Sequence, residues 1–346
     1  MSDSQDGDLA RVSDELPTLL SEARVPGLSV AIVREAKVTW AASYGLASLR
    51  PVRNVATDTV FQAASLSKPL FAYAVLGLVE RGILDLETPL SAYVPDSYMS
   101  DDPQIATITA RHVLCHTTGW PNWRSKSEPF VRRHASGEVF SYSGEGYVYL
   151  QKVVEHLTGQ PLDVFMREAV LDPLGLVSSN YRWPASDDPV LAKAHDDDGR
   201  PTKPYSGDGP EAASSLHTTA SDFARFLCAM LESPRLPNLP SIETPYAMLQ
   251  PQIRLGDALA WGLGWGLEDT DLGPAFWHWG DNPGYKSIAL ALPALGTGIV
   301  VMTNGDNGLS LCDYLVRTIA GDGHPAFRWL AETFYGVPTL AAIYNA

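Results

Sequence analysis

The chain is organised around residues 61 to 69, which are Phe61-Gln62-Ala63-Ala64-Ser65-Leu66-Ser67-Lys68-Pro69. Side chains three residues apart on a helix share one face, so the Ser65 hydroxyl and the Lys68 amine can come within hydrogen-bonding distance if a helix starts here. Pro69 favours such a start, because a proline deep inside a helix deletes a hydrogen bond and clashes with the carbonyl four residues earlier. We therefore expect a buried helix over residues 70–81, ended by Gly82, with Ser65 as an activated nucleophile at its beginning.

Length and composition predict a globular protein. The 346 residues are 45% hydrophobic and 19% charged, which suits one large domain or two closely packed ones. The net charge of -15 opposes binding to nucleic acid. The polar, acidic N-terminus lacks the features of a secretory signal, so we expect a cytoplasmic protein.

The sequence offers little sign of a membrane span, a disulfide framework or a structural metal. Its longest apolar candidate, residues 287–303, is interrupted by Pro293, Gly296 and Gly298, which favours two strands joined by a turn over a membrane span. The three cysteines lie far apart and form no CxxC pattern. We expect no cofactor and no metal.

The order of the expected elements predicts the fold class. Residues 28–33 and 38–44 form a β-hairpin after a helix over 9–24 that Pro17 should kink or split. A long, mostly helical stretch follows, and the last third contains the strand-like segments 261–267, 276–279, 286–292 and 298–304 and the helix 309–320. The fold is therefore α+β, an antiparallel sheet built from both chain ends and flanked by helices, with an inserted mostly helical domain. We expect a sheet domain of residues 1–60 and 240–346, a helical domain of residues 61–239, and an active site at their junction.

Two polar sites in the helical stretch bear on function. Tyr142 lies in a loop of small residues before the helix 147–157, which Gly159 should end, and we expect its side chain to be exposed at the helix entrance. His116 lies in a tight turn with Thr117, Thr118 and Gly119, and we expect a hydrogen-bonded structural histidine there.

Three motifs in this order carry a family resemblance: Ser65-Leu66-Ser67-Lys68, Tyr142-Ser143-Gly144 and His278-Trp279-Gly280. With them, the chain resembles the penicillin-recognising serine hydrolases, specifically the class C β-lactamase-like branch with its family VIII esterases and D-amino-acid peptidases. The resemblance implies a β-lactamase/transpeptidase-like fold. It covers nearly the whole chain.

The resemblance also implies roles for individual residues. Ser65 would be the acylated nucleophile, Lys68 its base or proton relay, and Tyr142 the phenol that passes a proton to the leaving group. His278 stands where the family most often has lysine. The backbone N–H groups of Ser65 and Asp281 would bind the oxyanion.

Two glycines near these motifs have consequences for the substrate. Gly280 would let the strand backbone approach the substrate closely. Gly144 departs from the class C β-lactamases, which usually have an asparagine there to hold a substrate amide. This difference shifts the expected substrate from β-lactams toward esters.

The chemistry of the side chains requires that Lys68 be assisted. A serine hydroxyl is a poor nucleophile until a neighbour removes its proton, and a lysine with a pKa of about 10.4 is almost fully protonated at neutral pH. Burial would lower the Lys68 pKa, and a close phenol could share the proton. We therefore treat Lys68 and Tyr142 as one coupled acid–base unit.

Aromatic residues are candidates for the substrate pocket. Trp120 and Trp123 would form an apolar acyl or alcohol pocket. Trp279, like Trp261, Trp265 and Trp277, is expected to pack in the core or the pocket wall rather than bind a cofactor. Alternation along a strand predicts that His278 and Trp279 point to opposite faces. Lys286 is expected to be a surface or edge charge.

The expected function is a serine hydrolase that cleaves small esters or activated amides through an acyl-enzyme on Ser65. The alternatives are a D-stereospecific amidase or peptidase, a weak β-lactamase, and a non-catalytic penicillin-binding-like protein. No G-x-S-x-G elbow and no H-E-x-x-H pair is present, which argues against an α/β-hydrolase or a zinc protease. The partner would be a small-molecule substrate, with neither nucleic acid nor a membrane.

Overall fold

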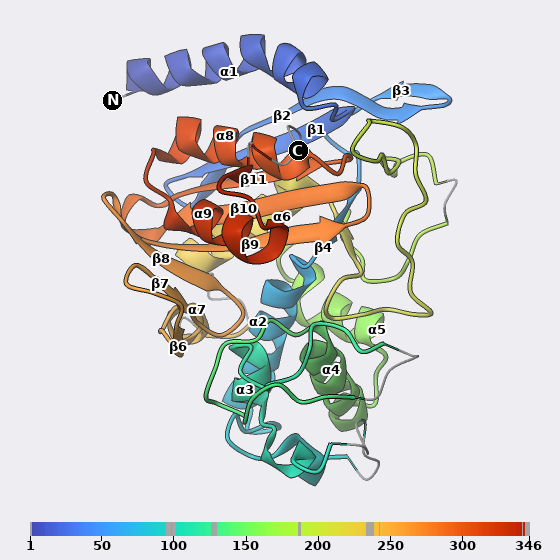
Figure 1. Ribbon diagram of the computed structural model, residues 1–346, viewed down its shortest axis with the longest axis vertical. Helices are drawn as coiled ribbons and strands as arrows, with labels where there is room; N and C mark the ends of the chain where they lie inside the picture. The colour runs from blue at the N-terminus through green and yellow to red at the C-terminus, as the bar shows by residue number, and fades with distance from the viewer. Residues whose placement is uncertain are drawn as a thin grey trace.

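A computed structural model describes residues 2–94, 98, 102–125, 130–185, 188–232, 239–241, 243–340 and 342. Within these residues, both ends of the chain form a nine-stranded sheet with the strand order β3-β2-β1-β11-β10-β9-β8-β7-β6 (Figure 1). All pairings in it are antiparallel, which confirms the predicted sheet. The strands are β1 Gly27–Arg34, β2 Lys37–Leu49, β3 Val52–Asn54, β6 Ile253–Arg254, β7 Leu259–Trp261, β8 Gly266–Thr270, β9 Gly273–Asn282, β10 Tyr285–Leu292 and β11 Thr297–Thr303.

The middle of the sheet is covered on both faces. Strand β1 pairs with β11, with Val30 opposite Val301 and Ala31 opposite Val300. Side chains alternate between the two faces of a strand. Val30 and Val301 accordingly belong to one hydrophobic cluster, and Ala31 and Val300 belong to the other. Both halves of the chain therefore contribute to two cores, one on each face.

Helices lie against the sheet and below it (Figure 1). Helices α1 and α8 contact the sheet on one face, while α6 contacts β1 and β11. Helices α2 to α5 lie below the sheet in Figure 1, and β4 (Phe61–Ala64) and β5 (Leu216–Thr218) form a small second sheet. The helices are α1 Ser2–Glu22, α2 Ser67–Glu80, α3 Ala110–Leu114, α4 Gly144–Thr158, α5 Leu162–Met166, α6 Ala220–Leu231, α7 Glu243–Met248, α8 Gly308–Ala320 and α9 Pro325–Leu330.

The domain boundaries at residues 60 and 240 stay a prediction. Helix α6 falls within residues 61–239, which were expected to form the helical domain, yet it packs on the sheet. Its amphipathic sequence provides the reason, because Phe223, Phe226 and Leu227 are buried while Arg225 on the other side is exposed.

The first helix differs from its prediction. Pro17 does not split the helix, which was one of its two expected effects, since α1 runs from Ser2 to Glu22 with Pro17 inside it. The buried residues Val12, Leu16 and Leu20 recur at helical spacing, whereas Pro17 is exposed. Proline has no N–H to donate to the carbonyl four residues earlier in the helix. On the exposed side of α1, water can donate to that carbonyl instead.

The apolar segment 287–303 forms most of β10 and β11, joined by a short helical turn, Pro293–Leu295. Two strands and a turn are therefore confirmed. Among the described residues, no helix is long and apolar enough to cross a membrane.

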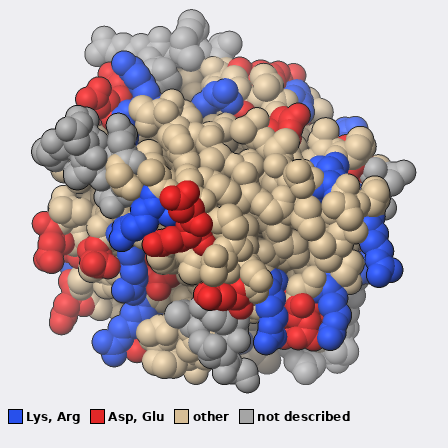
Figure 2. All heavy atoms as spheres, turned by 90° about the horizontal axis from the view of Figure 1, so that it is seen from above, with Lys and Arg blue, Asp and Glu red and all other residues tan. Residues whose placement is uncertain are grey.

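Lys and Arg side chains are interspersed with Asp and Glu on the face shown in Figure 2.

Candidate active site

Ser65 lies in the turn between β4 and α2. Ala64, the last residue of β4, has a φ of 51°, which is unusual for a residue with a side chain. Helix α2 begins at Ser67, and the Lys68 N–H closes the turn on the Ser65 carbonyl at 3.0 Å. The Lys68 Nζ donates to the Ser65 Oγ at 2.9 Å and to the Ala213 carbonyl at 2.8 Å. The structure thus brings together the serine and lysine singled out in the sequence.

Lys68 is fully buried. Burial lowers its pKa from the ordinary value of 10.5 to about 7, and the Glu211 carboxylate opposes this shift by favouring the charged form. The ammonium also lies 4.8 Å from the centre of the Tyr142 ring and 5.6 Å from that of Tyr147. A substantial fraction of Lys68 is therefore neutral near pH 7 and able to accept a proton.

Tyr142 is 9% exposed, so the expectation of an exposed tyrosine is wrong. Its ring is enclosed by aromatic neighbours from other parts of the chain, including Trp279 at 4.8 Å. Burial raises the pKa of Tyr142, although the nearby Ser65 side chain acts in the opposite direction. The hydroxyl makes no hydrogen bond of regular geometry with the described residues. The phenol therefore stays protonated at neutral pH, and its hydroxyl is close to Ser65.

His116 holds the loop that carries Tyr142. Its Nδ1 accepts from the Ser143 N–H at 3.1 Å, and its carbonyl accepts from the Ser141 N–H at 2.7 Å. Its ring lies 4.2 Å from the Tyr142 ring. Burial, followed by the charge of Lys68, lowers the His116 pKa well below its usual value, so the imidazole is neutral. The hydrogen-bonded histidine is confirmed, and its ring also contacts that of Tyr142.

His278, on β9, is also buried against Tyr142, with 6.2 Å between the ring centres. Burial and then the charge of Lys68 lower its pKa to about 3, so it is neutral at pH 7. Its Nδ1 lies 2.7 Å from the Trp279 carbonyl. A carbonyl only accepts, so we assign the proton to Nδ1, which leaves Nε2 as a buried acceptor.

The expected separation of His278 and Trp279 onto opposite faces does not hold for their rings. Their rings stack with centres 5.3 Å apart, and both lie beside Tyr142. The hydrogen bond from Nδ1 to the neighbouring carbonyl turns the imidazole along the strand, so simple alternation fails at this position.

Gly280 allows β9 to approach β4 just before Ser65. A Cβ atom at this position would lie 2.2 Å from the Ala63 carbonyl oxygen and 2.2 Å from the Ser287 Oγ. Gly280 therefore lies against the backbone of β4. Asp281 is the next residue of β9, so it lies at the end of β9 that approaches β4. Any larger residue at position 280 would push β9 away from the Ser65 turn.

Lys286 is not the surface charge that the sequence suggested. It is 6% exposed, and its Nζ lies 3.0 Å from Asp281 and 2.6 Å from Asp306. It also donates to the Asn282 carbonyl at 3.2 Å. A charged group can be buried when it is paired in this way. The ion pairs fix the turn between β9 and β10 next to Gly280.

Gly144 leaves room for Trp123. A Cβ atom at Gly144 would lie 2.7 Å from the Trp123 ring, and the Gly144 N–H donates to the Asn122 Oδ1 at 2.9 Å. Trp123 is 44% exposed and lines a pocket of about 580 Å³ together with Glu211 and Asp281. The Glu211 carboxylate raises the pKa of Lys68, and the Asp281 carboxylate raises the pKa of Tyr142. The pocket therefore adjoins the site.

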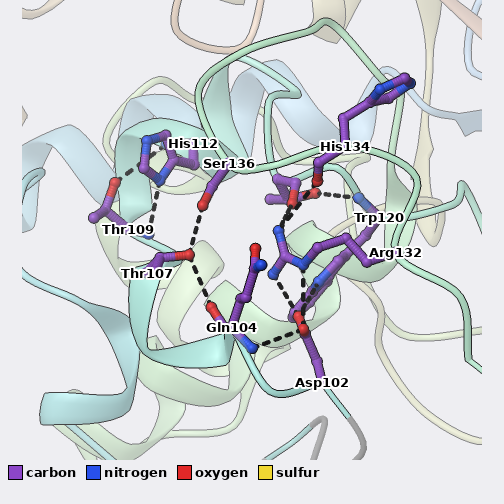
Figure 3. Close-up of polar contacts among 10 residues, drawn as sticks. Asp102, Gln104, Thr107, Thr109, His112, Trp120, Arg132, His134 and Ser136 are labelled. Atoms are coloured by element: carbon purple, nitrogen blue, oxygen red, sulfur yellow. Dashed lines mark hydrogen bonds and ion pairs between the residues drawn. The ribbon is translucent and has the colours of Figure 1, made fainter.

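Trp120 does not line this pocket. It is fully buried, and its Nε1 donates to Asp102 at 2.8 Å, which in turn pairs with Arg132 (Figure 3). A buried indole N–H needs an acceptor, and Asp102 provides it away from the site. The Trp120 carbonyl accepts from the Ser141 Oγ at 3.0 Å, so Trp120 supports the Tyr142 loop from behind.

Sequence reasoning missed Glu211 and the C-terminal aromatic residues. Glu211 falls in an irregular region without a motif, and it accepts from the Ser214 Oγ at 2.6 Å. Phe334 lies 4.8 Å from Trp279 and 5.8 Å from Tyr142, measured between ring centres. No local pattern marks either contact, because both depend on the tertiary fold. In the described part of the chain, no cluster of three or more His, Cys, Asp or Glu side chains could hold a metal ion.

A family model described as Beta-lactamase matches residues 10–318. The chain belongs to the beta-lactamase family. This beta-lactamase-family protein is 27% identical over 352 residues to Penicillin-binding protein 4 of Amycolatopsis lactamdurans, with 91% of this chain and 90% of that protein covered. It is 29% identical over 231 residues to Esterase EstB of Burkholderia gladioli, covering 58% of each.

Solved structures of other proteins have the same fold as this beta-lactamase-family protein. A structure described as a class C beta-lactamase has a TM-score of 0.80 at 20% identity, covering 93% of this chain and 98% of that one. The octameric penicillin-binding protein homologue from Pyrococcus abyssi has a TM-score of 0.76 at 22% identity, covering 91% and 78%. The predicted β-lactamase-like fold and membership of the penicillin-recognising serine hydrolases are confirmed.

Proposed function

We propose that this protein is a serine hydrolase that cleaves small carboxylic esters or activated amides through an acyl-enzyme on Ser65. One observation carries the proposal: the Ser65 hydroxyl accepts a 2.9 Å hydrogen bond from Lys68, whose pKa burial lowers to about 7. A lysine that is partly neutral at pH 7 can reverse this hydrogen bond and remove the serine proton.

Acylation would begin when neutral Lys68 takes the proton from the Ser65 Oγ as this oxygen attacks the substrate carbonyl carbon. The carbonyl π electrons move to the oxygen, which becomes an oxyanion bound by the backbone N–H groups of Ser65 and Asp281. Losing one such donor typically reduces the rate on the order of a hundredfold or more. Gly280 and the Lys286 ion pairs hold the Asp281 end of β9 near Ser65.

Tyr142 would complete acylation. Its raised pKa keeps the phenol protonated, so it can donate that proton to the leaving oxygen or nitrogen as the bond to the carbonyl carbon breaks. The proton on Lys68 then restores the phenol, and both groups lie next to Ser65. A water molecule hydrolyses the acyl-enzyme by the same proton transfers in reverse.

The surroundings of the nucleophile favour esters over β-lactams. Penicillins and cephalosporins carry a carboxylate, and His278, being neutral, provides no positive charge where the family most often has lysine. Gly144 has no side chain, the Trp123 ring lies over it, and the oxygen of the neighbouring Asn122 amide is already engaged by the Gly144 N–H. An apolar surface binds an alkyl or aryl group better than it binds an amide.

A comparison of p-nitrophenyl butyrate, D-alanine p-nitroanilide and nitrocefin tests the proposed function. The two departures at His278 and Gly144 lead us to expect a kcat/KM for the butyrate ester at least about a hundredfold above that for nitrocefin. The control is the double variant Trp123→Ala/Gly144→Asn, which restores an amide and removes the ring that would clash with it. This double variant should lower the ratio of kcat/KM for the butyrate ester to kcat/KM for nitrocefin. A wild-type preference for nitrocefin would refute the ester assignment, and a preference for the D-alanyl amide would favour the amidase alternative.

A further inference from the structure

The C-terminal segment Ala331–Tyr335 forms a single π-helical turn directly after α9. It lies beyond residues 10–318, the part of the chain that matches the family model. Single π-helical turns are rare and often occur at functional sites. In Figure 1 the C-terminal helices are drawn in front of β9, and the ring contacts of Phe334 with Trp279 place this segment against the site.

Phe334 extends the aromatic group around Tyr142. Its ring centre is 4.8 Å from that of Trp279, 5.4 Å from that of Trp329 and 5.8 Å from that of Tyr142. Phe334 is 37% exposed, whereas Trp279 is 3% and Tyr142 9% exposed. Of Phe334, Trp279 and Tyr142, Phe334 is therefore the residue that exposes the largest fraction of its surface to an incoming molecule.

The neighbouring residue fixes the segment in place. The Tyr335 hydroxyl donates to the Asp281 Oδ2 at 2.5 Å, and the Lys286 Nζ lies 3.0 Å from the Asp281 Oδ1. Asp281 is also the residue whose backbone N–H we assign to the oxyanion. The C-terminal segment is thus tied to the same end of β9 that borders Ser65, and Phe334 is held rather than left as a loose surface side chain.

We propose that Phe334 forms a wall of the leaving-group side of the substrate pocket and makes the enzyme prefer esters of apolar or aryl-bearing alcohols. This inference rests on the proposed function. Tyr142 donates its proton to the leaving oxygen, so the alcohol portion of the ester must lie next to Tyr142. Phe334 packs against the Tyr142 ring, which places it among the residues nearest to that portion. An apolar alcohol group would bury the exposed part of the Phe334 ring.

The test compares ethyl acetate with 2-phenylethyl acetate in a pH-stat. The two esters share an acyl group and have alcohols of similar acidity, so their kcat/KM ratio reports on alcohol recognition. We expect wild type to favour 2-phenylethyl acetate and Phe334→Ala to reduce this preference about tenfold, the usual size for lost apolar contact in a pocket. Phe334→Leu, which keeps an apolar side chain, should give an intermediate ratio, and near-UV circular dichroism checks that both variants fold.

Leu295 provides a matched control. It is 50% exposed in the turn between β10 and β11, and Leu295→Ala should leave the ratio at its wild-type value. Wild-type ratios in folded Phe334→Ala and Phe334→Leu would overturn the inference while leaving the proposed function intact. If the wild type hydrolyses neither these acetates nor p-nitrophenyl butyrate, the proposed function fails and the inference fails with it.

Discussion

Replacing Ser65 with alanine is expected to reduce kcat/KM for p-nitrophenyl butyrate by at least about 10⁴-fold, because removing a catalytic nucleophile typically costs this much or more. The Lys68 amine would lose the hydroxyl that it now contacts at 2.9 Å, while its bond to the Ala213 carbonyl would remain. The protein should therefore stay folded but lose activity. The measurement is steady-state hydrolysis at pH 8 with matched thermal unfolding curves.

Ser67 is the matched control for this substitution. It lies two residues away, is buried, and uses its hydroxyl for the Ala64 carbonyl and the Leu216 N–H at 2.5 and 2.9 Å. Its role is structural, so Ser67→Ala should cost stability and far less turnover per folded molecule than Ser65→Ala. Unchanged turnover in Ser65→Ala would show that the reaction does not use this serine.

The second large effect concerns the charge of Lys68. Its pKa is about 7, and only the neutral amine can accept the serine proton. The wild-type kcat/KM should therefore rise with pH through about 7 and fall as the pH drops below it. Lys68→Met should reduce kcat/KM on the order of 10³-fold, within the range for general acid–base catalysis, and should remove this ascending limb. The measurement is a pH profile of kcat/KM from pH 5 to 9.

Two observations separate Lys68 from other groups that could titrate in this range. The pKa of His278 is about 3 and that of His116 is well below 6.5, so neither should produce a limb near 7. The Glu211 carboxylate raises the Lys68 pKa, so Glu211→Gln should move the limb to lower pH. A limb that keeps its midpoint in Glu211→Gln and persists in Lys68→Met would rule out Lys68 as the titrating base.

Much of the fold could be predicted because its signals are local. Two runs rich in strand-forming residues and a tight turn between them predict the hairpin of β1 and β2, and the glycines and proline within residues 287–303 predict two strands rather than a membrane helix. Gly159 ends α4 as expected, with a left-handed φ of 68°. Helix α1 continues through Pro17, where the burial of Val12, Leu16 and Leu20 along one side of the helix outweighs the local preference of proline.

The candidate site was predictable only in part, because many of its contacts join distant residues. Ser65 and Lys68 are three residues apart, so their contact follows from the tight turn that leads into α2. The burial of Lys286 depends on Asp306, twenty positions later in the chain, and that of Tyr142 on rings from β9 and the C-terminus. Trp120 and Trp123 are close in sequence, yet Asp102 draws one into the core and Gly144 lets the other lie at the pocket.

The most direct test of covalent catalysis at Ser65 is the intact mass of the protein after treatment with a p-nitrophenyl alkylphosphonate. Such a compound phosphonylates an activated serine and is not turned over. We predict one phosphonyl group per wild-type molecule, on the peptide that contains Ser65, and none on Ser65→Ala under the same conditions. An equal adduct on both proteins, or an unmodified wild type that still hydrolyses p-nitrophenyl butyrate, would contradict the acyl-enzyme on Ser65.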